Sequence, residues 1–477
     1  MASEHGINPA GPDVLQHIEA AIGAAAMLSP EARYLEEPRG RYHGQAAAIL
    51  RPASTEEVAA VVRICAEARV GIVPFAGGTG LVGGQIAEDL PAPLVLSFER
   101  MNRIRHVDVT DNAIVAEAGV ILADVQAAAE AANRRFPLSL ASEGTARIGG
   151  LLATNAGGLN VLRYGNARDL CYGVEAVMAD GSTFEGLRPL MKNNMGYDLR
   201  HLLIGSEGTL GLITAASLRL YPIPSHAATA WLAVPSPAAA LDLLALARDR
   251  MGHSISAFEL MSCRGFDFLA ETMPQIPQPP RLGTDWIVLT EAEEGPGTAL
   301  EERFAELIET AMTEGLVEDG LMAQNEAQRK SFWTVRETIP EANRLIGSIS
   351  SHDVSVPPSQ LVTFIDEAGR ALAALDPDMR INCFGHLGDG NLHYNVFPPK
   401  GRTRADFENL RGTVKQTVHE CVHELGGSVG AEHGVGRLKV QDLQRFSAPG
   451  EYRAMQRIKS ALDPEGILNP GAVIAQN

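Results

Sequence analysis

Cysteine is scarce in this 477-residue sequence, which holds five and forms no CxxC pair from them. The five are Cys65, Cys171, Cys263, Cys383 and Cys421. An odd and dispersed set is typical of free thiols in a reducing compartment. The first residues, Met1–His5, carry an acidic residue and no basic n-region, so we expect no signal peptide and a cytoplasmic protein.

Long apolar runs and excess positive charge are also missing. No stretch reaches the ~18 uninterrupted apolar residues of a membrane span. Lys plus Arg number 40 against 58 for Asp plus Glu, which gives a net charge of -18, and no local basic patch stands out. An acidic chain repels phosphate backbones and anionic lipid heads, so the charge argues against nucleic-acid and membrane-surface binding. The apolar fraction of 45% still supplies a buried core.

Helix and strand signals alternate along the first half of the chain, which indicates an α+β or α/β architecture. Ser54 and Glu57 form a capping box at the start of an apolar helical pattern. Short buried strands are predicted at 71–75, 94–97 and 113–118.

A proline-containing stretch, Pro222–Ser225, is predicted to separate two domains. At ~150 residues per domain the length fits two or three. We therefore expect an N-terminal helical segment over residues 1–45, a first domain over 46–224 and a second domain over 225–477. Long helices are expected in the second domain at 236–249 and 299–315.

The glycines, 47 in all, gather in three clusters at 77–84, 144–165 and 205–211. Successive glycines let backbone N–H groups turn inward and approach a ligand, which makes a nest for phosphate. The first cluster is no Walker loop, since no GK[ST] follows, and it lacks the GxGxxG pattern. A pair of tight turns would explain one cluster alone, whereas three favour a large phosphate or cofactor site.

The same clusters resemble loops of the FAD-binding proteins related to vanillyl-alcohol oxidase, which share a PCMH-type FAD domain. The matching stretches are Pro74-Phe75-Ala76-Gly77-Gly78-Thr79-Gly80-Leu81-Val82-Gly83-Gly84, Ile148-Gly149-Gly150-Leu151-Leu152-Ala153-Thr154-Asn155-Ala156-Gly157-Gly158, Arg163-Tyr164-Gly165, Ile204-Gly205-Ser206-Glu207-Gly208-Thr209-Leu210-Gly211 and Leu468-Asn469-Pro470-Gly471. They follow the family's order over about residues 45–475. The sequence is most similar to the D-2-hydroxy acid dehydrogenase branch of that superfamily.

This resemblance implies an α+β fold: a two-subdomain PCMH-type FAD domain, then an α+β substrate domain with a C-terminal helical segment. It implies FAD held by Pro74, Gly77, Gly78, Thr79, Gly80, Leu81, Gly84, Pro137, Ser142, Glu143, Gly144, Thr145, Gly149, Gly150, Ala153, Asn155, Gly157, Gly158, Tyr164, Gly165, Glu207, Gly208, Gly211, Ile213 and Asn469. Some relatives attach the flavin through His or Cys near the first loop. Residues 74–85 contain neither, so we expect non-covalent FAD.

A histidine-rich stretch lies near the C-terminus, Gly385-His386-Leu387-Gly388-Asp389-Gly390-Asn391-Leu392-His393-Tyr394-Asn395. Asp-Gly between strand-like runs predicts a two-residue hairpin turn. His386 would then lie opposite His393, with Asn395 on the same face of the sheet. Two imidazoles suit one metal ion, but the site needs a carboxylate, which Glu432 offers. A hairpin with two surface histidines is the alternative.

The family resemblance implies that His386, His393 and Glu432 bind a divalent metal and that His433 is the base. Zn is the expected metal, and Mn and Fe are the alternatives. A 2-hydroxy acid chelating the metal would have a lowered hydroxyl pKa. His433, with an ordinary pKa near ~6.5, would take the hydroxyl proton while hydride leaves C2 for flavin N5. We add Asn395 to the catalytic set.

Arg336 resembles the arginine with which the family binds the substrate carboxylate, a task that suits a guanidinium fork. An exposed helical Arg paired with a nearby Glu is the alternative. D-2-hydroxyglutarate enzymes also carry a Lys shortly before the counterpart of Asp353. In those enzymes this Lys meets the distal carboxylate of the substrate. Here Ser350, Ser351 and His352 stand instead. A lactate-like substrate fits at least as well, unless a protonated His352 replaces the Lys.

The sequence therefore indicates an FAD-dependent, metal-assisted D-2-hydroxy acid dehydrogenase. An oxygen-using oxidase and a non-catalytic flavoprotein subunit of a glycolate-oxidase-like complex are the alternatives. Expected partners are a small 2-hydroxy acid, an electron acceptor (electron-transfer flavoprotein, quinone or cytochrome) and a second copy of the chain in a homodimer. No nucleic acid and no transmembrane segment are expected.

Overall fold

The computed structural model describes residues 6–37, 40 and 42–475, so the expectation for Met1–His5 lies outside the described residues. The chain divides into two compact units. The first comprises Met1–Gly158, Gly165–Ile223 and Glu432–Asn477, and the second comprises Leu159–Tyr164 and Pro224–Ala431. The α+β class expected from the sequence is confirmed. In the described part of the chain, no helix has the length and apolar character to span a membrane.

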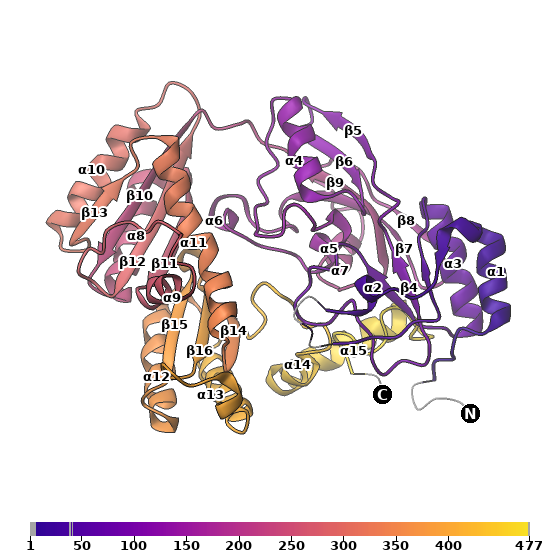
Figure 1. The fold of residues 1–477 in the computed structure, drawn as a ribbon. Coiled ribbons are helices and arrows are strands. Elements are labelled where there is room, and N and C mark those ends of the chain that lie inside the picture. Colours follow the sequence, from indigo (N-terminus) through magenta and orange to yellow (C-terminus); the bar gives the residue numbers. More distant parts are fainter. Residues whose placement is uncertain (1–5, 38–39, 41, 476–477) are drawn as a thin grey trace. The chain divides into compact units, whose positions relative to one another are not determined.

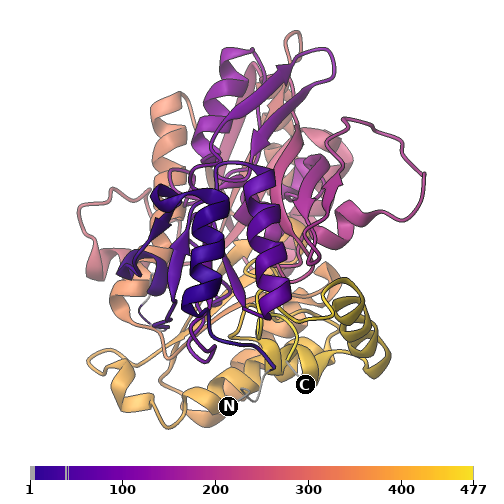
Figure 2. The ribbon, with the colours of Figure 1, turned by 90° about the vertical axis from the view of Figure 1, so that its right-hand side faces the viewer.

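A four-stranded sheet of the first unit has the order β1-β2-β4-β3. Its strands are β1 (Met27–Leu28), β2 (Ala48–Leu50), β3 (Ile72–Phe75) and β4 (Leu94–Ser97). Strands β2, β4 and β3 run parallel, and β1 pairs antiparallel with β2. Helices α1 (Pro12–Ile22) and α3 (Thr55–Ala68) bury their apolar stripes against this sheet and each other (Figure 2).

The start of α3 shows how the sequence sets a helix boundary. The Ser54 hydroxyl accepts the N–H of Glu57 at 3.3 Å, as predicted. The Glu57 carboxylate accepts the N–H of Ala53 at 2.7 Å, one residue before the position that a capping box uses.

A second sheet of this unit is antiparallel, with the order β5-β6-β9-β7-β8 (Figure 1). Its strands are β5 (Ile104–Asp108), β6 (Ala113–Glu117), β7 (Cys171–Val177), β8 (Thr183–Glu185) and β9 (Leu212–Arg219). The remaining helices of the unit are α2 (Ala32–Leu35), α4 (Leu122–Ala131), α5 (Ile148–Ala153), α7 (Leu199–Leu203), α14 (Val440–Phe446) and α15 (Pro449–Leu462). The predicted strands at 71–75, 94–97 and 113–118 are thus confirmed.

The C-terminal segment belongs to the first unit, whereas the sequence-based division placed it in the second domain. Leu468 forms a parallel bridge with Ile72 of β3. The ammonium group of Lys459, on α15, donates to the carbonyls of Thr209 and Leu468, each at 2.8 Å. These contacts tie the C-terminal segment to β3 and to the third glycine cluster, in line with the family resemblance of Leu468–Gly471.

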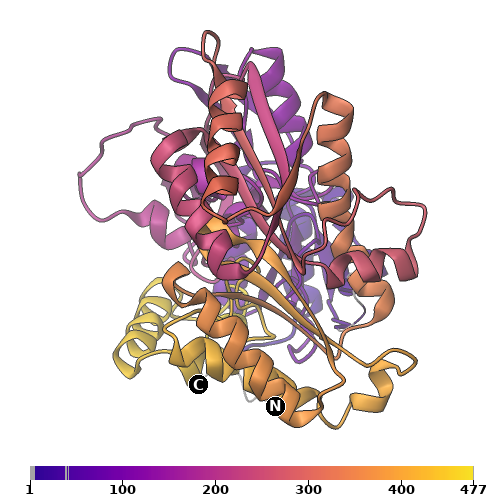
Figure 3. The same cartoon turned by 90° about the vertical axis from the view of Figure 1, so that its left-hand side faces the viewer.

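The second unit is built on a seven-stranded antiparallel sheet of order β13-β10-β12-β11-β15-β16-β14 (Figure 3). Its strands are β10 (His226–Val234), β11 (Ile255–Ser262), β12 (Trp286–Glu294), β13 (Asp319–Met322), β14 (Ser350–Ser355), β15 (Arg380–His386) and β16 (Asn391–Phe397). Its helices are α6 (Val161–Tyr164), α8 (Pro237–Met251), α9 (Arg264–Thr272), α10 (Leu300–Thr313), α11 (Glu326–Ile346), α12 (Leu361–Leu375) and α13 (Arg411–Glu424). The long helices predicted at 236–249 and 299–315 correspond to α8 and α10.

Two apolar cores cover the two faces of this sheet. Helices α8, α10, α12 and α13 pack on one face, and α9 and α11 pack on the other. Because side chains alternate along a strand, Phe384 of β15 enters the α9 and α11 core while its neighbour Cys383 enters the opposite core. This alternation decides which polar residues share a face.

Candidate active site

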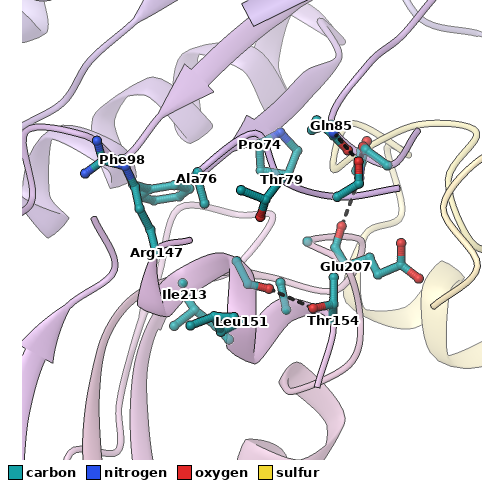
Figure 4. Close-up of a pocket in the computed structure, with 18 of the residues that line it drawn as sticks. Pro74, Ala76, Thr79, Gln85, Phe98, Arg147, Leu151, Thr154, Glu207 and Ile213 are labelled. Atoms are coloured by element: carbon teal, nitrogen blue, oxygen red, sulfur yellow. Dashed lines mark hydrogen bonds between the residues drawn. The ribbon is translucent and has the colours of Figure 1, made fainter. Parts of the chain in front are cut away.

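The three glycine clusters meet around one pocket of the first unit (Figure 4). The predicted cofactor residues that line it are Pro74, Gly77, Gly78, Thr79, Gly80, Gly84, Gly149, Gly150, Ala153, Glu207, Gly208, Gly211, Ile213 and Asn469. Segments that lie far apart in the sequence, such as 77–84 and 207–213, thus line one pocket, so a single ligand can contact all of them.

The other predicted cofactor residues do not line this pocket. They are Leu81, Pro137, Ser142, Glu143, Gly144, Thr145, Asn155, Gly157, Gly158, Tyr164 and Gly165. Some support its wall: the carbonyl of Thr145 lies against Gly77, and the Asn155 amide oxygen accepts the N–H of Arg168 at 2.9 Å. Tyr164 belongs to the second unit.

Two glycines of the pocket leave no room for a side chain. A Cβ on Gly77 would lie 2.4 Å from the carbonyl oxygen of Thr145, a backbone atom that has no alternative rotamer. Gly208 has a φ of +71°, and a Cβ there would lie 2.6 Å from the ring of Pro74. The bare backbone is therefore a requirement of this wall, and it leaves peptide N–H groups available to a bound anion.

Sequence reasoning missed several residues of the pocket. Gln85 donates to the carbonyl of Gly80 at 2.9 Å, and Arg147 donates to the carbonyl of Gly119. Phe98 contributes an aromatic face beside Arg147 (Figure 4). Gln85 and Arg147 flank the glycine clusters directly, so proximity to those clusters was the available signal, whereas Phe98 had none.

Glu207 joins the pocket to the segment that follows Glu432. Its carboxylate accepts the N–H groups of Val435 at 2.7 Å and of Gly436 at 2.9 Å. Burial raises the pKa of this carboxyl group, while the two N–H groups act in the opposite direction. Its φ of +51° is rare for a non-glycine residue. His433 therefore lies on a segment that is anchored at the pocket wall.

Arg437 completes this anchor. Its guanidinium donates to the carbonyls of Gly83 and Gly84, at 3.2 and 2.9 Å, and to the carbonyl of Pro470 at 2.8 Å. Burial lowers the pKa of Arg437 to about 10. The amide of Asn469 donates to the carbonyls of Gly84 and Glu207 at 3.0 and 2.9 Å. Asn469 thus shapes the wall through the backbone of both glycine loops.

The histidine hairpin differs from its prediction in register. Leu387–Asp389 form a short 3₁₀ turn before Gly390, so the connection is longer than the expected two residues. His393 pairs with Phe384, not with His386, and His386 pairs with Glu259 of β11. The predicted pairing is wrong by two residues. An offset of two preserves the face, because side chains alternate with period two.

The two histidines still approach each other, with ring centroids 5.8 Å apart. His386, His393 and Glu432 each offer a ligand atom, and these atoms all lie within 4.8 Å of one another. Glu432 directly follows Ala431, the last residue of the second unit. This set contains two imidazoles and one carboxylate, which is a donor set that divalent zinc accepts.

Glu259 is the residue of this centre that sequence reasoning missed. It is fully buried on β11, and its Oε1 lies 2.5 Å from Nδ1 of His386. Its Oε2 accepts the Nε–H of Arg336 at 2.6 Å. Burial alone raises the pKa of Glu259, but Arg336 and His386 outweigh it and lower the pKa to about 2. A single charged residue inside the apolar run 255–261 was the signal.

Arg336 and Asn395 lie on the same sheet face as these groups. The Arg336 guanidinium is buried and lies over the ring of Phe384, 4.9 Å from its centroid. It pairs with Glu259 across the sheet face, so the alternative of an exposed arginine is wrong. Asn395 pairs with Asn382 of β15 and with Ser351 of β14.

His352 points to the opposite face. Asp353 is the residue of β14 that pairs with His393, so its neighbour His352 faces the α13 side, where its ring lies 5.2 Å from that of His419. His352 therefore faces away from the sheet face that carries His393 and Asn395, which argues against the alternative in which it replaces the missing lysine. Ser351 is the residue of β14 that pairs with Asn395, and its hydroxyl lies 2.7 Å from that of Ser348.

Known protein families and single proteins match most of this chain. Residues 46–186 match the family described as FAD binding domain, and residues 223–473 match FAD linked oxidases, C-terminal domain. D-2-hydroxyglutarate dehydrogenase of Xanthomonas citri pv. viticola is 37% identical over 89% of this chain and 88% of its own length. The mitochondrial D-2-hydroxyglutarate dehydrogenase of Bos taurus is 36% identical, over 96% of this chain and 82% of its own.

Solved structures share the fold. p-Cresol methylhydroxylase with bound substrate superposes with a TM-score of 0.76 at 17% identity, covering 97% of this chain and 96% of its own. Alkyldihydroxyacetonephosphate synthase superposes with a TM-score of 0.73 at 17% identity, covering 98% of this chain and 87% of its own. The expected PCMH-type fold is confirmed.

The substitution Gly77→Ala tests the pocket. We expect a clear loss of bound flavin, because the new Cβ would collide with the Thr145 carbonyl and push the loop away from its ligand. The ratio of flavin to protein absorbance measures this loss. Gly450→Ala, in α15 of the same unit, is the matched control, since its Cβ meets nothing within 4 Å. Equal flavin content in both variants would contradict the role of Gly77.

Proposed function

The chain belongs to the FAD-dependent D-2-hydroxy acid dehydrogenases, and from this premise we propose that its substrate is a monocarboxylic, lactate-like D-2-hydroxy acid, oxidised to the 2-oxo acid. Ser351 carries this choice of substrate. It lies opposite Asn395 on the face that holds His393, and it offers a hydroxyl group and no charge. A second substrate carboxylate would find no lysine there, and His352 faces the other side of the sheet.

D-2-hydroxyglutarate is the second candidate. The similarity to D-2-hydroxyglutarate dehydrogenases over about nine tenths of the chain favours it. The two candidates share every other element of the site and differ only in whether a cation meets a distal carboxylate.

We propose that FAD binds without a covalent bond. The residues that line the pocket include no His and no Cys within the described chain. The glycine walls, the peptide N–H groups and Arg147 suit a long ligand with a pyrophosphate. Bound FAD supplies the hydride acceptor of the reaction.

We propose that His386, His393 and Glu432 hold a divalent metal, with Zn favoured over Mn and Fe. The distances among their ligand atoms support this proposal, and so does the contact that reserves Nδ1 of His386 for Glu259. Such an ion supplies Lewis acidity that lowers the pKa of the substrate hydroxyl.

The protein's own groups do the remaining work. A ring nitrogen of His433 takes the hydroxyl proton, since histidine serves as a base near neutral pH. Arg336 binds the substrate carboxylate with the two terminal nitrogens of its guanidinium. Asn395 orients the substrate with its amide group, and it is itself held where its Oδ1 accepts the N–H of His352 at 3.3 Å.

We also propose the electron acceptor, the cellular location and the assembly of the protein. A protein or quinone acceptor, such as electron-transfer flavoprotein or a cytochrome, reoxidises the flavin. The five cysteines are free thiols in the structure, which supports a reducing, cytoplasmic location, and a homodimer is the proposed assembly.

Anaerobic bleaching of the flavin tests the substrate. We expect D-lactate to reduce the flavin faster than D-2-hydroxyglutarate does, and L-lactate to serve as an inert control. Ser351→Lys should shift the preference toward D-2-hydroxyglutarate by about tenfold or more, since a charge-assisted hydrogen bond contributes ~1.5–3 kcal/mol. A wild-type preference for D-2-hydroxyglutarate that Ser351→Lys leaves unchanged would refute the monocarboxylate proposal.

The substitution His433→Ala tests the base. We expect normal flavin content and a fall of ~10²–10⁴-fold in the rate of anaerobic flavin reduction, because a general base is lost. Stopped-flow absorbance measures this rate. His201→Ala, an exposed histidine of the same unit, should reduce at the wild-type rate. Wild-type speed in His433→Ala would rule out its role as the base.

Metal removal tests the ion. Dialysis against a chelator should stop flavin reduction while the protein stays yellow, and added Zn²⁺ should restore it. His393→Ala should show the same defect and resist rescue, whereas His253→Ala, an exposed histidine of the second unit, should behave as wild type. Full activity after verified removal of all divalent metal would count against the site.

A further inference from the structure

We propose that Glu259 is a positioning residue, which holds His386 in the orientation of a metal ligand and Arg336 in the orientation of a carboxylate-binding group. This inference rests on the proposed function and names the residue on which two of its groups depend. Both oxygens of Glu259 are used by protein groups, so we propose no contact of Glu259 with substrate or cofactor.

The contacts of Glu259 are divided between its two oxygens. Oε1 meets Nδ1 of His386 at 2.5 Å, and Oε2 meets Nε of Arg336 at 2.6 Å. Strand register makes the first contact, since Glu259 and His386 are direct partners on β11 and β15. Helix α11, packed on this face, brings the second. Only 1% of Glu259 is exposed, so water does not compete for either contact.

Each contact selects one state of its partner. With Nδ1 of His386 engaged by a carboxylate, Nε2 is the nitrogen that presents its lone pair to a metal. Arg336 uses Nε for Glu259 and stacks on Phe384, which fixes the plane of its guanidinium. Among the described residues, its two terminal nitrogens make no hydrogen bond, so they are available as a fork for a carboxylate.

A neighbouring glutamate provides an internal comparison. Glu291 lies on β12, next to β11, and is also buried. Its carboxylate accepts from Thr229 at 2.7 Å, from Arg329 at 2.7 and 2.9 Å and from Trp333 Nε1 at 2.9 Å. Arg329 stands on α11 two turns before Arg336. All partners of Glu291 are structural, whereas both partners of Glu259 belong to the proposed site.

The pair of substitutions Glu259→Gln and Glu291→Gln therefore separates positioning from stability. Both remove one buried charge that faces an arginine of α11. We expect the flavin-loaded, metal-free Glu259→Gln enzyme to bind Zn²⁺ about 10–100-fold more weakly than wild type in calorimetric titration. Loss of the hydrogen-bond partner of a metal ligand typically weakens metal binding by this factor. Its KM for the D-2-hydroxy acid should also rise, while Glu291→Gln keeps the wild-type values for both. Flavin content reports that the first unit of each variant is folded, and a circular-dichroism melting curve reports the same for the second unit, which carries both substitutions.

A double substitution shows whether Glu259 acts through His386. In a His386→Ala background, Glu259→Gln should weaken Zn²⁺ binding no further, because residues that act as a unit are not additive. If Glu259→Gln proves too unstable to load flavin, Glu259→Asp takes its place: it keeps the charge, is too short to reach both partners and should bind Zn²⁺ at intermediate strength.

Three outcomes would overturn the proposal: wild-type Zn²⁺ affinity in Glu259→Gln, an equal loss in Glu291→Gln, or additive losses with His386→Ala. A wild-type protein that takes up no Zn²⁺ while its flavin is still reduced by the D-2-hydroxy acid would also overturn it. That last result would be compatible with the dehydrogenase activity, so failure of the positioning role can be distinguished from failure of the proposed function. Failure of every D-2-hydroxy acid to reduce the flavin, with Zn²⁺ affinity lost only in Glu259→Gln, would instead refute the function and support the positioning role.

Discussion

The site of the second unit depends on one constraint, the cost of keeping a carboxylate charged where water does not reach. Glu259 meets this constraint because a guanidinium and an imidazole share its two oxygens, and together they hold its pKa near 2 despite complete burial. The same contacts join β11, β15 and α11 at one point. The groups proposed to bind metal and substrate are thus oriented by the requirement to neutralise a buried charge.

Local patterns predicted much of the fold. The helix that begins after Ser54, the strands around Val73 and Leu96 and the two long helices near 236–249 and 299–315 all follow from spacing and capping residues. The three glycine clusters also predicted that they form one cofactor pocket. A backbone that closely approaches a ligand needs residues without a side chain, and only glycine meets that need. These features depend on neighbours within a few residues, which a sequence displays directly.

The details of the site depend on distant contacts, which a sequence does not display. The Asp389-Gly390 pair predicted a two-residue turn, but Leu387–Asp389 form a 3₁₀ turn, and His393 pairs with Phe384 two residues away from the expected partner. A register shift of two residues keeps His386 and His393 on the same face of the sheet, so the predicted metal-ligand pair is still formed. Glu259 lies 127 residues before His386, and only an unexplained charge in an apolar strand hinted at its partner. The orientation of His352 likewise followed from the register of β14, not from its chemistry.

The assignment of Glu432–Asn477 to the first unit gives the chain the form of a domain insertion. In order along the chain, the polypeptide leaves the first unit, completes most of the second and returns, so both described ends belong to the same compact body. The residue pair Glu432 and His433 stands at the point of return, immediately before the segment that Glu207 and Arg437 anchor. Because the first unit is assembled from three separate segments, the backbone that carries the proposed base His433 has a fixed place only when the third segment is packed against the other two.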